Sequence, residues 1–421
     1  MDPSDICNEL YRLARTQPGE SRLHRYSERR VWLVQDPQDA HRILKSNVAN
    51  WPKHMAWMRQ TLGPSRMSEN HEAWAFRRQL TQPHFNHYDV EKTVQATRAA
   101  FHQALPQLIG QTQAAPLSDE RLRRMTIQVL AEVMLDVDFQ ATGIDPQNLF
   151  HLLELGAQYA FVPPGGLAGE ARRQHLTRLN AAKAKVMHDM ALFRRPEFAG
   201  KPIIRDMLQA EAATRHQPDR FVLEQELITL FAAGSETSAS MFGWACHLLA
   251  QHPAVQDQLR EEARAWADPA ESPAPLLDDF LSETMRLFPA NPILSRYALE
   301  ADAFSTGAVE AGDVALVSLV GLQMHRQWRD HPWQLDLSAA RAHHNREGSG
   351  FGTAFGVGER VCGGRLFALT EMRTLVRELV LHAQVLPTAQ EPLNQPIDLQ
   401  WCSLLVRRGG HRVRLQPLAF A

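Results

Sequence analysis

The chain has 421 residues, 44% of them apolar and 22% charged, a balance typical of a globular protein with a large core. The formal net charge of −2 provides no broad positive field, so we expect no nucleic-acid partner. The polar N-terminus lacks a signal-peptide pattern and no run of about 18 apolar residues occurs, so we expect no stable membrane insertion.

The four cysteines, Cys7, Cys246, Cys362 and Cys402, show neither CxxC spacing nor the pattern of a disulfide framework. This usage fits reduced thiols and a cytoplasmic location, because disulfides persist mainly in oxidising compartments. The sequence contains no internal repeat and no low-complexity linker, so we expect a single domain over residues 1–421.

The predicted elements are mostly helical. Residues Arg22–Gln35 predict a hairpin, and helical patterns dominate from Asp39 to Leu386. Pro253–Trp266 predicts an amphipathic surface helix. Val314–Val320 and Leu399–Arg408 predict strands, the second forming a hairpin with the segment beyond a Gly-Gly turn. The fold class expected is mainly α with small peripheral β-sheets, the β-rich part covering about 22–50, 290–320 and 399–417 and the helical part about 51–290 and 321–386.

One predicted helix, Phe221–Pro253, is apolar almost all round, which indicates a helix buried inside a large protein. From Ala233 its centre reads AGSETS, and Gly234 alone costs about 1 kcal/mol relative to alanine. A buried acid such as Glu236 is rarely retained without a partner or a task. Thr237 has the simpler alternative of a hydrogen bond to the carbonyl of Ala233.

A glycine-rich loop surrounds one cysteine. Residues Phe351–Gly364 read FGTAFGVGERVCGG, with Arg360 two positions before Cys362. Glycine at this density indicates a tight turn or the close approach of another group. A helix pattern, Gly363–Ala383, follows directly, and a helix N-terminus stabilises a thiolate. A thiolate beside an arginine suits axial ligation of a haem, whereas a buried structural thiol is the simpler alternative.

The pattern Phe355-x-x-Gly358-x-Arg360-x-Cys362-x-Gly364 resembles the haem-binding signature of the cytochrome P450 family. This resemblance implies that Cys362 ligates the haem iron and that Arg360 meets a propionate. It further implies that Phe355 packs beside the sulfur and that Gly358 permits the turn. Gly364 would let the following helix approach the porphyrin.

The AGSETS segment is similar to the family's oxygen-activation segment, with Ala233 and Gly234 facing the haem. By this resemblance Thr237 is expected to hydrogen-bond dioxygen, and Glu236 and Thr237 together are expected to relay protons. These two residues are the expected catalytic pair.

Further propionate ligands follow from the same resemblance. Trp74 and Arg78 lie four residues apart in the segment His71–Phe85, which resembles the family's propionate-binding helix. An amphipathic helix with a surface arginine is the alternative. Arg296 resembles a further propionate ligand supplied by a strand.

Glu283 and Arg286 are one helical turn apart and resemble the structural ion pair of the family. Alone, this spacing is typical of a weak surface salt bridge. The third member of the cluster is expected to be Arg341.

The resemblance implies a soluble, bacterial-type haem-thiolate monooxygenase, monomeric and used in secondary metabolism. Its cofactor would be haem b (iron protoporphyrin IX), with electrons from NAD(P)H through a ferredoxin or flavodoxin-type donor and its reductase. No flavin or nicotinamide motif occurs in the chain, so that donor must be a separate protein. Peroxide-using or isomerising haem-thiolate enzymes and a non-catalytic haem sensor or electron carrier are the alternatives.

The substrate is expected to be a lipophilic small molecule, terpenoid, fatty acyl, aromatic or peptide. The segments expected to line its pocket are Trp51–Gly63, Ala157–Gly166, the helix face near Phe231, Ala290–Leu294 and the hairpin near Trp401. The arginines expected to guide an acidic electron donor to the cysteine side are Arg77, Arg360, Arg365, Arg373 and Arg377.

Overall fold

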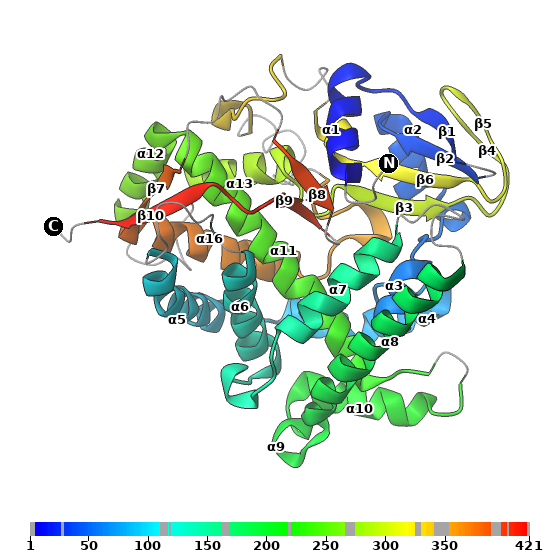
Figure 1. Cartoon of the computed structure of the whole chain (residues 1–421), viewed down its shortest axis with the longest axis horizontal. Coiled ribbons are helices and arrows are strands. Elements are labelled where there is room, and N and C mark those ends of the chain that lie inside the picture. Colours follow the sequence, from blue (N-terminus) through cyan, green and yellow to red (C-terminus); the bar gives the residue numbers. More distant parts are fainter. Residues whose placement is uncertain are drawn as a thin grey trace.

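The computed structural model describes residues 5–26, 29–109, 117, 119–160, 169–217, 220–265, 274–324, 330–340, 353–388, 397–401 and 404–418. Its longer helices are α1 (Ile6–Thr16), α4 (His71–Asn86), α5 (Val90–Ile109), α6 (Asp119–Leu130), α7 (Gln147–Ala160), α8 (Gly169–Met190), α10 (Pro202–Thr214), α11 (Leu223–Gln251), α12 (Pro253–Ala265), α13 (Pro275–Leu287) and α16 (Arg365–His382). The shorter helices are α2 (Pro37–His41), α3 (Ala56–Leu62), α9 (Pro196–Ala199) and α14 (Leu319–Gln323). The expected class, mainly helical with small sheets, is confirmed (Figure 1).

The strands form one four-stranded sheet and three pairs. They are β1 (Arg22–Tyr26), β2 (Arg29–Val34), β3 (Ile293–Tyr297), β4 (Asp302–Phe304), β5 (Gly307–Val309), β6 (Val314–Ser318), β7 (Ala383–Pro387), β8 (Leu399–Trp401), β9 (Leu405–Arg407) and β10 (Val413–Pro417). The large sheet has the order β1-β2-β6-β3 and lies beside α1, away from most helices (Figure 1). The predicted hairpin is β1–β2, in which Arg22 pairs with Leu33.

An aromatic cluster fills the core beneath this sheet. Phe304 packs edge-on against Trp32, with ring centroids 5.1 Å apart, and stacks on Trp51 at 5.5 Å. Each indole donates its N–H to a carboxylate at 2.9 Å, Trp32 to Asp313 and Trp51 to Asp302. These bonds satisfy the polar edges of two buried rings and fix the sheet against the segment that leads to α3.

Two strand predictions were wrong in part. The strand expected over Val314–Val320 ends at Ser318, whose hydroxyl accepts the N–H of Gly321 and caps α14. The expected strand Leu399–Arg408 is itself a pair, β8 with β9. The segment beyond the Gly-Gly turn forms β10 and pairs with β7 instead of β9. The Gly-Gly turn favoured pairing with the strand just before it, β9. In the structure β7, which follows α16, provides the edge with which β10 pairs.

Helix α11 runs through the middle of the molecule and is buried along most of its length, as its sequence predicted (Figure 1). It packs extensively against α6 and α16. Gly234 permits the close α6 contact, because a Cβ there would lie 2.7 Å from a methyl carbon of Leu130 and would displace that side chain. The glycine that lowers the intrinsic stability of α11 therefore lets α6 pack closely against it.

A buried ion pair joins α13 to the segment at 330–340. Arg286 donates to Glu283 at 2.7 Å and to the carbonyl of Gln334 at 2.9 Å. The N–H of Asp336 donates to Glu283 at 2.9 Å, so the carboxylate is saturated with donors. The predicted pair is thus present and buried; its expected third member, Arg341, lies outside the described residues.

Replacement of Glu283 by glutamine is expected to lower the free energy of unfolding by about 3–5 kcal/mol, because it leaves the Arg286 charge buried without compensation. Chemical denaturation of both proteins measures the change. The matched control is Glu170→Gln, which breaks the exposed Glu170–Arg173 pair and should leave the midpoint unchanged. Equal midpoints for wild type and Glu283→Gln would contradict this account.

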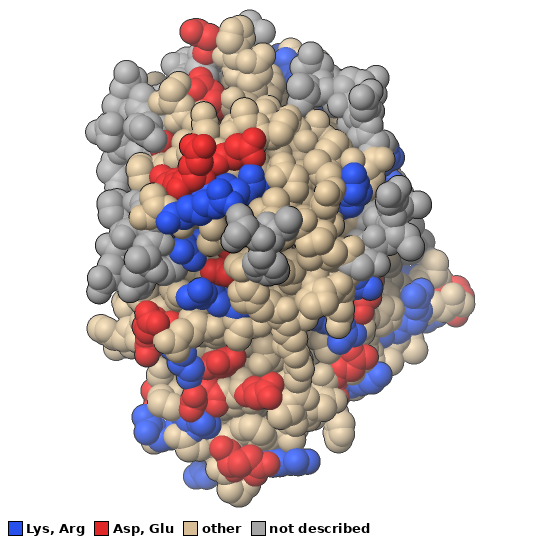
Figure 2. Space-filling model, turned by 90° about the vertical axis from the view of Figure 1, so that its left-hand side faces the viewer, with Lys and Arg blue, Asp and Glu red and all other residues tan. Residues whose placement is uncertain are grey.

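Surface features are less distinctive. Among the described residues, no helix combines the length and the apolar character needed to cross a membrane. Figure 2 shows one face of the molecule, on which acidic and basic side chains are interspersed in small groups. Neither sign forms a continuous field on that face.

Candidate active site

A cavity of about 580 Å³ lies between α11, α4, the strand β3 and the cysteine loop. The predicted site residues that line it are Trp74, Arg78, Ala233, Gly234, Glu236, Thr237, Arg296, Phe355, Arg360, Cys362 and Gly364. Gly358 is the predicted site residue that does not line it. The structure therefore brings together residues from four separate parts of the chain around one cavity.

The cysteine loop is built by backbone hydrogen bonds within itself. The N–H of Cys362 donates to the carbonyl of Phe355 at 2.8 Å, which closes the loop on the two residues that flank the cavity. Gly358 has a φ of +71°, and a Cβ there would lie 2.4 Å from the carbonyl oxygen of Leu44. Gly358 therefore acts through the turn and through close packing, as predicted for the turn, rather than through the cavity wall.

Cys362 points into the cavity three residues before α16 begins. Burial raises the pKa of its thiol above the ordinary value. The backbone N–H of Gly364 and the positive charges of Arg66, Arg365 and Lys53 act in the opposite direction and favour the thiolate. Since a metal ion at the sulfur deprotonates a thiol outright, this environment is consistent with a metal-ligating cysteine.

Positive charge is concentrated at one end of the cavity, on Lys53, Arg66, Arg78, Arg296 and Arg360. Burial, followed by repulsion from Arg296 and Arg360, lowers the pKa of Lys53 to about 7. Burial and the charge of Arg360 likewise lower the pKa of Arg296 to about 10. Desolvation therefore disfavours the charged forms of Lys53 and Arg296.

The hydrogen bonds of these cations go largely to neutral oxygens. Lys53 donates to the carbonyl of Met67 at 3.2 Å, and Arg296 donates to the carbonyl of its neighbour Ser295 at 2.9 Å. Carboxylates brought into the cavity would stabilise this excess of buried positive charge. The two propionates of a haem satisfy this requirement, so the residues present fit that cofactor.

Trp74 orients two of these arginines. The guanidinium carbon of Arg360 lies 3.6 Å from the centroid of the Trp74 ring and that of Arg78 lies 5.2 Å from it. Arg78 also donates to the carbonyl of Glu359 in the cysteine loop. Stacking on the indole is a cation–π interaction, which restricts the arginines to the cavity edge. The i,i+4 spacing in α4 placed Trp74 and Arg78 together as expected.

Lys53 and Arg66 were missed by the sequence reasoning. Lys53 pairs with Arg296 through an isolated β-bridge, and Arg66 donates to Thr81 of α4 at 2.8 Å. Both contacts connect segments that are distant in the sequence, so no local spacing indicated them. The available signal for Lys53 was its charge, which stands within a segment that was otherwise expected to form an apolar pocket wall.

On the α11 side, Glu236 and Thr237 face the same cavity. The hydroxyl of Thr237 donates to the carbonyl of Ala233 at 2.9 Å, so the simpler alternative bond is present in this structure. Glu236 is 3% exposed and its Oε1 lies 3.4 Å from Nε of Arg123. Burial raises the pKa of Glu236 to about 7, an effect that the charge of Arg123 opposes and nearby acids reinforce.

Two arginines expected on the electron-donor side are buried instead. Arg77 pairs with Glu226 of α11 at 2.7 Å, and Arg377 pairs with Glu378 at 3.1 Å. Adjacent side chains on a helix point about 100° apart, so a position one residue away from an outward-facing side chain can face the core. The prediction that Arg77 and Arg377 form part of an exposed patch was therefore wrong.

The remaining pocket predictions were mixed. Residues from Trp51–Gly63, Ala290–Leu294 and Trp401 line the cavity. Phe231 does not, because its ring packs in the core against Phe139 and Phe193, while the adjacent positions of α11 face the cavity. Of the segment expected at Ala157–Gly166, residues 161–166 lie outside the described residues.

Comparison with known proteins identifies the family. The family model for Cytochrome P450 matches residues 2–413, nearly the whole chain. The chain belongs to the cytochrome P450 family. Members of this family hold a haem iron and receive electrons from a redox partner. The fold and family predicted from the sequence are both confirmed.

Named relatives are distant. The chain is 29% identical to human cytochrome P450 4F11 over 57% of its own length and 44% of that protein, so the match spans less than half of this relative. It is 25% identical to rat cytochrome P450 4F3, over 86% of this chain and 75% of that protein. The alkane hydroxylase MAH1 of Arabidopsis thaliana is 24% identical over 82% of this chain and 76% of that protein.

Solved structures support the fold. The crystal structure of cytochrome P450 CYP102L1 superposes with a TM-score of 0.76 and 22% identity, over 99% of each chain. A mutant of the cytochrome P450DA heme domain gives a TM-score of 0.79 at 17% identity, over 99% of this chain and 94% of that one. At these identities the likeness concerns the fold.

The raised pKa of Glu236 predicts a pH window for stability. Its folded-state pKa of about 7 lies above the ordinary 4.5, so the unfolded chain ionises first and stability is lost as the pH rises through this interval. Relative to Glu236→Gln, the wild-type free energy of unfolding should fall by on the order of 3 kcal/mol between these pH values. Chemical denaturation at several pH values measures the difference.

Glu226 and Glu371, whose pKa values burial also raises, titrate in both proteins and cancel in this comparison. Glu120→Gln, which alters an exposed acid of α6, is the control and should show no such window. A constant difference between wild type and Glu236→Gln from pH 5 to pH 8 would show that Glu236 ionises normally.

Proposed function

We propose that this cytochrome P450 is a monooxygenase that inserts one oxygen atom from dioxygen into a lipophilic small molecule. The observation that carries the proposal is the placement of Cys362 and the Glu236–Thr237 pair on the walls of one cavity. A haem sensor or electron carrier requires the thiolate or the cation cluster but no buried acid and alcohol beside them. The alternative of a non-catalytic haem protein is therefore less well supported.

The cofactor that we propose is haem b. Cys362 would ligate the iron, and Arg78, Arg296 and Arg360 would bind the propionates over the face of Trp74, with Lys53 and Arg66 added from the structure. Phe355 and Gly364 would flank the ring beside the sulfur. When bound, a thiolate-ligated haem supplies the electron density that favours cleavage of the O–O bond.

The role proposed for α11 is proton delivery. A carboxyl with a pKa of about 7 is partly protonated near neutral pH, which is the condition for an efficient general acid. Glu236 would hold the proton, and the positive charge of Arg123 would stabilise the carboxylate that remains on Glu236 after the proton is transferred. The Thr237 hydroxyl, now bonded to Ala233, would place a donor at the cavity surface next to Ala233 and Gly234.

The proposed substrate class is an aliphatic chain that is converted to an alcohol. Methionines and large apolar side chains line much of the cavity, including Met55, Trp57, Met58, Met207 and Leu230. Such linings suit flexible lipophilic guests. Two relatives are named alkane hydroxylase and leukotriene-B4 omega-hydroxylase, and both names describe oxidation of a hydrocarbon chain.

Electrons are proposed to come from NAD(P)H through a separate ferredoxin or flavodoxin-type donor. With Arg77 and Arg377 buried, Arg360 on the cavity wall and Arg373 paired with Asp278 at 2.6 Å, we propose that Arg365, at the start of α16, and Lys45, near Gly358, guide the donor. We further propose one functional unit over the whole chain, acting as a monomer in the cytoplasm. The reduced thiol of buried Cys246 fits that compartment.

Cys362→Ser is expected to abolish the carbon-monoxide absorption band of reduced, thiolate-ligated haem, because a serine hydroxyl does not replace the thiolate. Absorption spectroscopy of the reduced protein with carbon monoxide measures this band. Cys246→Ala removes a thiol of α11 that does not line the cavity and should retain it. An unchanged band in Cys362→Ser would sink the ligand assignment.

Thr237→Ala is expected to retain haem, substrate binding and electron uptake but to divert reducing equivalents from product to hydrogen peroxide. Loss of a positioned proton donor is typically worth about 10²–10⁴-fold in the step that it assists. Product and peroxide formed per reducing equivalent, with a long-chain fatty acid or alkane that shifts the haem spectrum, give the coupling ratio.

Ser235→Ala is the matched control for Thr237→Ala. Ser235 donates to the carbonyl four residues earlier, that of Phe231, at 2.7 Å, yet it is buried away from the cavity. Ser235→Ala should therefore preserve coupling. Equal coupling in wild type and Thr237→Ala would remove Thr237 from proton delivery.

A further inference from the structure

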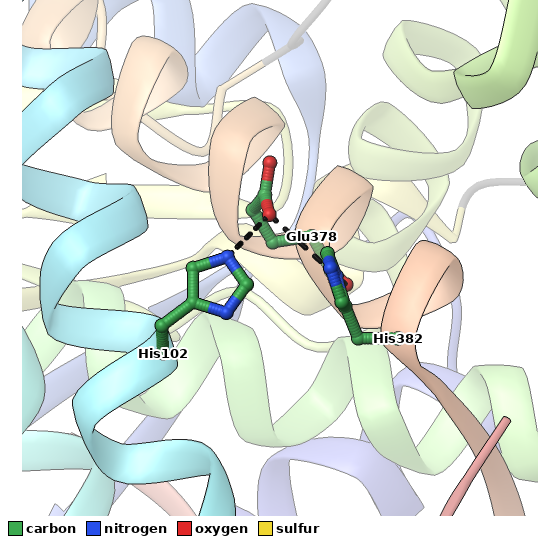
Figure 3. A group of neighbouring side chains, drawn as sticks. All are labelled: His102, Glu378 and His382. Carbon is green, nitrogen blue, oxygen red and sulfur yellow. Dashed lines mark hydrogen bonds and ion pairs between the residues drawn. The ribbon is translucent and has the colours of Figure 1, made fainter. Parts of the chain in front are cut away.

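A second cluster of chemically reactive side chains lies between α5 and α16 (Figure 3). His102 projects from α5 towards Glu378 and His382, which lie one turn apart on α16 (Figure 3). In the part of the chain that the structure describes, this is the one group of three or more His, Cys, Asp or Glu side chains with mutually close ligand atoms. None of the three residues lines the haem cavity.

The spacing of the ligand atoms suits a tetrahedral metal ion. Nε2 of His102 lies 2.9 Å and Nδ1 of His382 lies 3.6 Å from the same oxygen, Oε2 of Glu378. Ligands about 2.0–2.2 Å from a tetrahedral zinc ion are roughly 3.3–3.5 Å from one another. The two separations bracket that value, and all three ligand atoms lie within 4.8 Å of each other. Small side-chain rotations are enough to admit an ion.

The carboxylate is already held in an orientation that leaves one oxygen for the ion. Its Oε1 lies 3.1 Å from Nε of Arg98 and 3.1 Å from Nη1 of Arg377, while Oε2 faces the histidines. Carboxylates that ligate metals are usually hydrogen-bonded in this way through their second oxygen. The arginines also repel a cation, so the affinity depends on the two imidazoles.

Dependence on imidazole selects the kind of ion. Two nitrogen ligands and one oxygen suit zinc and its neighbours in the transition series, whereas Ca²⁺ and Mg²⁺ prefer oxygen alone. The Nδ1 of His382 also lies 2.9 Å from the carbonyl oxygen of Glu378, a bond that the ion would replace. The two imidazole rings stand perpendicular, 4.6 Å apart, so both can present a nitrogen to one point.

The cluster is open on one side. The side chain of Glu378 is 0% exposed, whereas those of His102 and His382 are 43% and 26% exposed. Solvent can therefore deliver the ion and supply a fourth ligand as water, while the charge of the carboxylate is shielded from bulk water. This combination provides both an entry path and a desolvated anionic ligand.

We propose that His102, Glu378 and His382 bind a divalent transition-metal ion of the zinc class and that the ion ties α5 to α16. Helix α16 begins directly after the cysteine loop, and α5 packs extensively against it. The site is independent of the proposed monooxygenase function, since it uses none of the residues assigned to the haem or to proton delivery.

The test is a zinc titration of the full-length, haem-loaded protein by isothermal calorimetry, compared with His102→Ala and His382→Ala. Wild type should bind one equivalent of zinc that either variant binds at least about tenfold more weakly, because each variant lacks a ligand. His151→Ala, which removes an exposed histidine of α7, should bind zinc as wild type does. Differences from wild type cancel any binding elsewhere, including at Cys362.

Anomalous diffraction at the zinc edge, from wild-type crystals soaked in zinc, gives an independent readout that does not depend on the variants folding. A peak between His102, Glu378 and His382 is the expected result. Zinc uptake that is the same in wild type, His102→Ala and His382→Ala, or an anomalous peak located only elsewhere, would overturn the proposal.

Discussion

Positive charge buried at one end of an apolar cavity is the constraint on which the rest of the site depends. Five cations converge there, and burial depresses the pKa of Lys53 to about 7 and of Arg296 to about 10. Desolvating such a cluster is costly, and an anion brought into the cavity would offset that cost. A bound haem would provide that anion through its propionates, and we propose that Cys362 would ligate its iron. The charge cluster and the cysteine would therefore hold the same cofactor, the cations through its propionates and the thiolate through its iron.

Helix α11 forms another wall of the cavity and makes two buried ion pairs with neighbouring helices. Near its start, Glu226 pairs with Arg77 of α4. Ten residues further along the helix, Glu236 lies 3.4 Å from Arg123 of α6, a longer separation than the 2.7 Å between Glu226 and Arg77. The first pair is closed by hydrogen bonds and fixes the helix, whereas the second leaves Oε1 of Glu236 without a hydrogen-bond partner among the described residues. Because its carboxyl is incompletely satisfied and faces the cavity, Glu236 is the group of α11 that we propose as the proton donor.

The sequence predicted best those features that depend on neighbouring residues. The loop around Cys362 and the pair Trp74 and Arg78 depend on short spacings, and Cys362, Trp74 and Arg78 all line the cavity, although their roles at a haem stay predictions. Features set by contacts between distant segments were missed or wrong. Lys53 meets Arg296 only in the folded protein, and the partner of β10 is β7 rather than the nearer β9. The sequence also did not show which way each side chain of α4 points. Arg77 faces α11, whereas its neighbour Arg78 faces the cavity.

A crystal structure of the haem-loaded protein would show whether Cys362 and the buried cations together bind one haem. We expect a bond from the Sγ atom of Cys362 to the iron and propionates in contact with Arg296, Arg360 and Lys53. We also expect Thr237 on the opposite side of the ring from the sulfur. A haem ligated by another residue, or propionates directed away from these cations, would show that the site is not a haem-thiolate site of this kind.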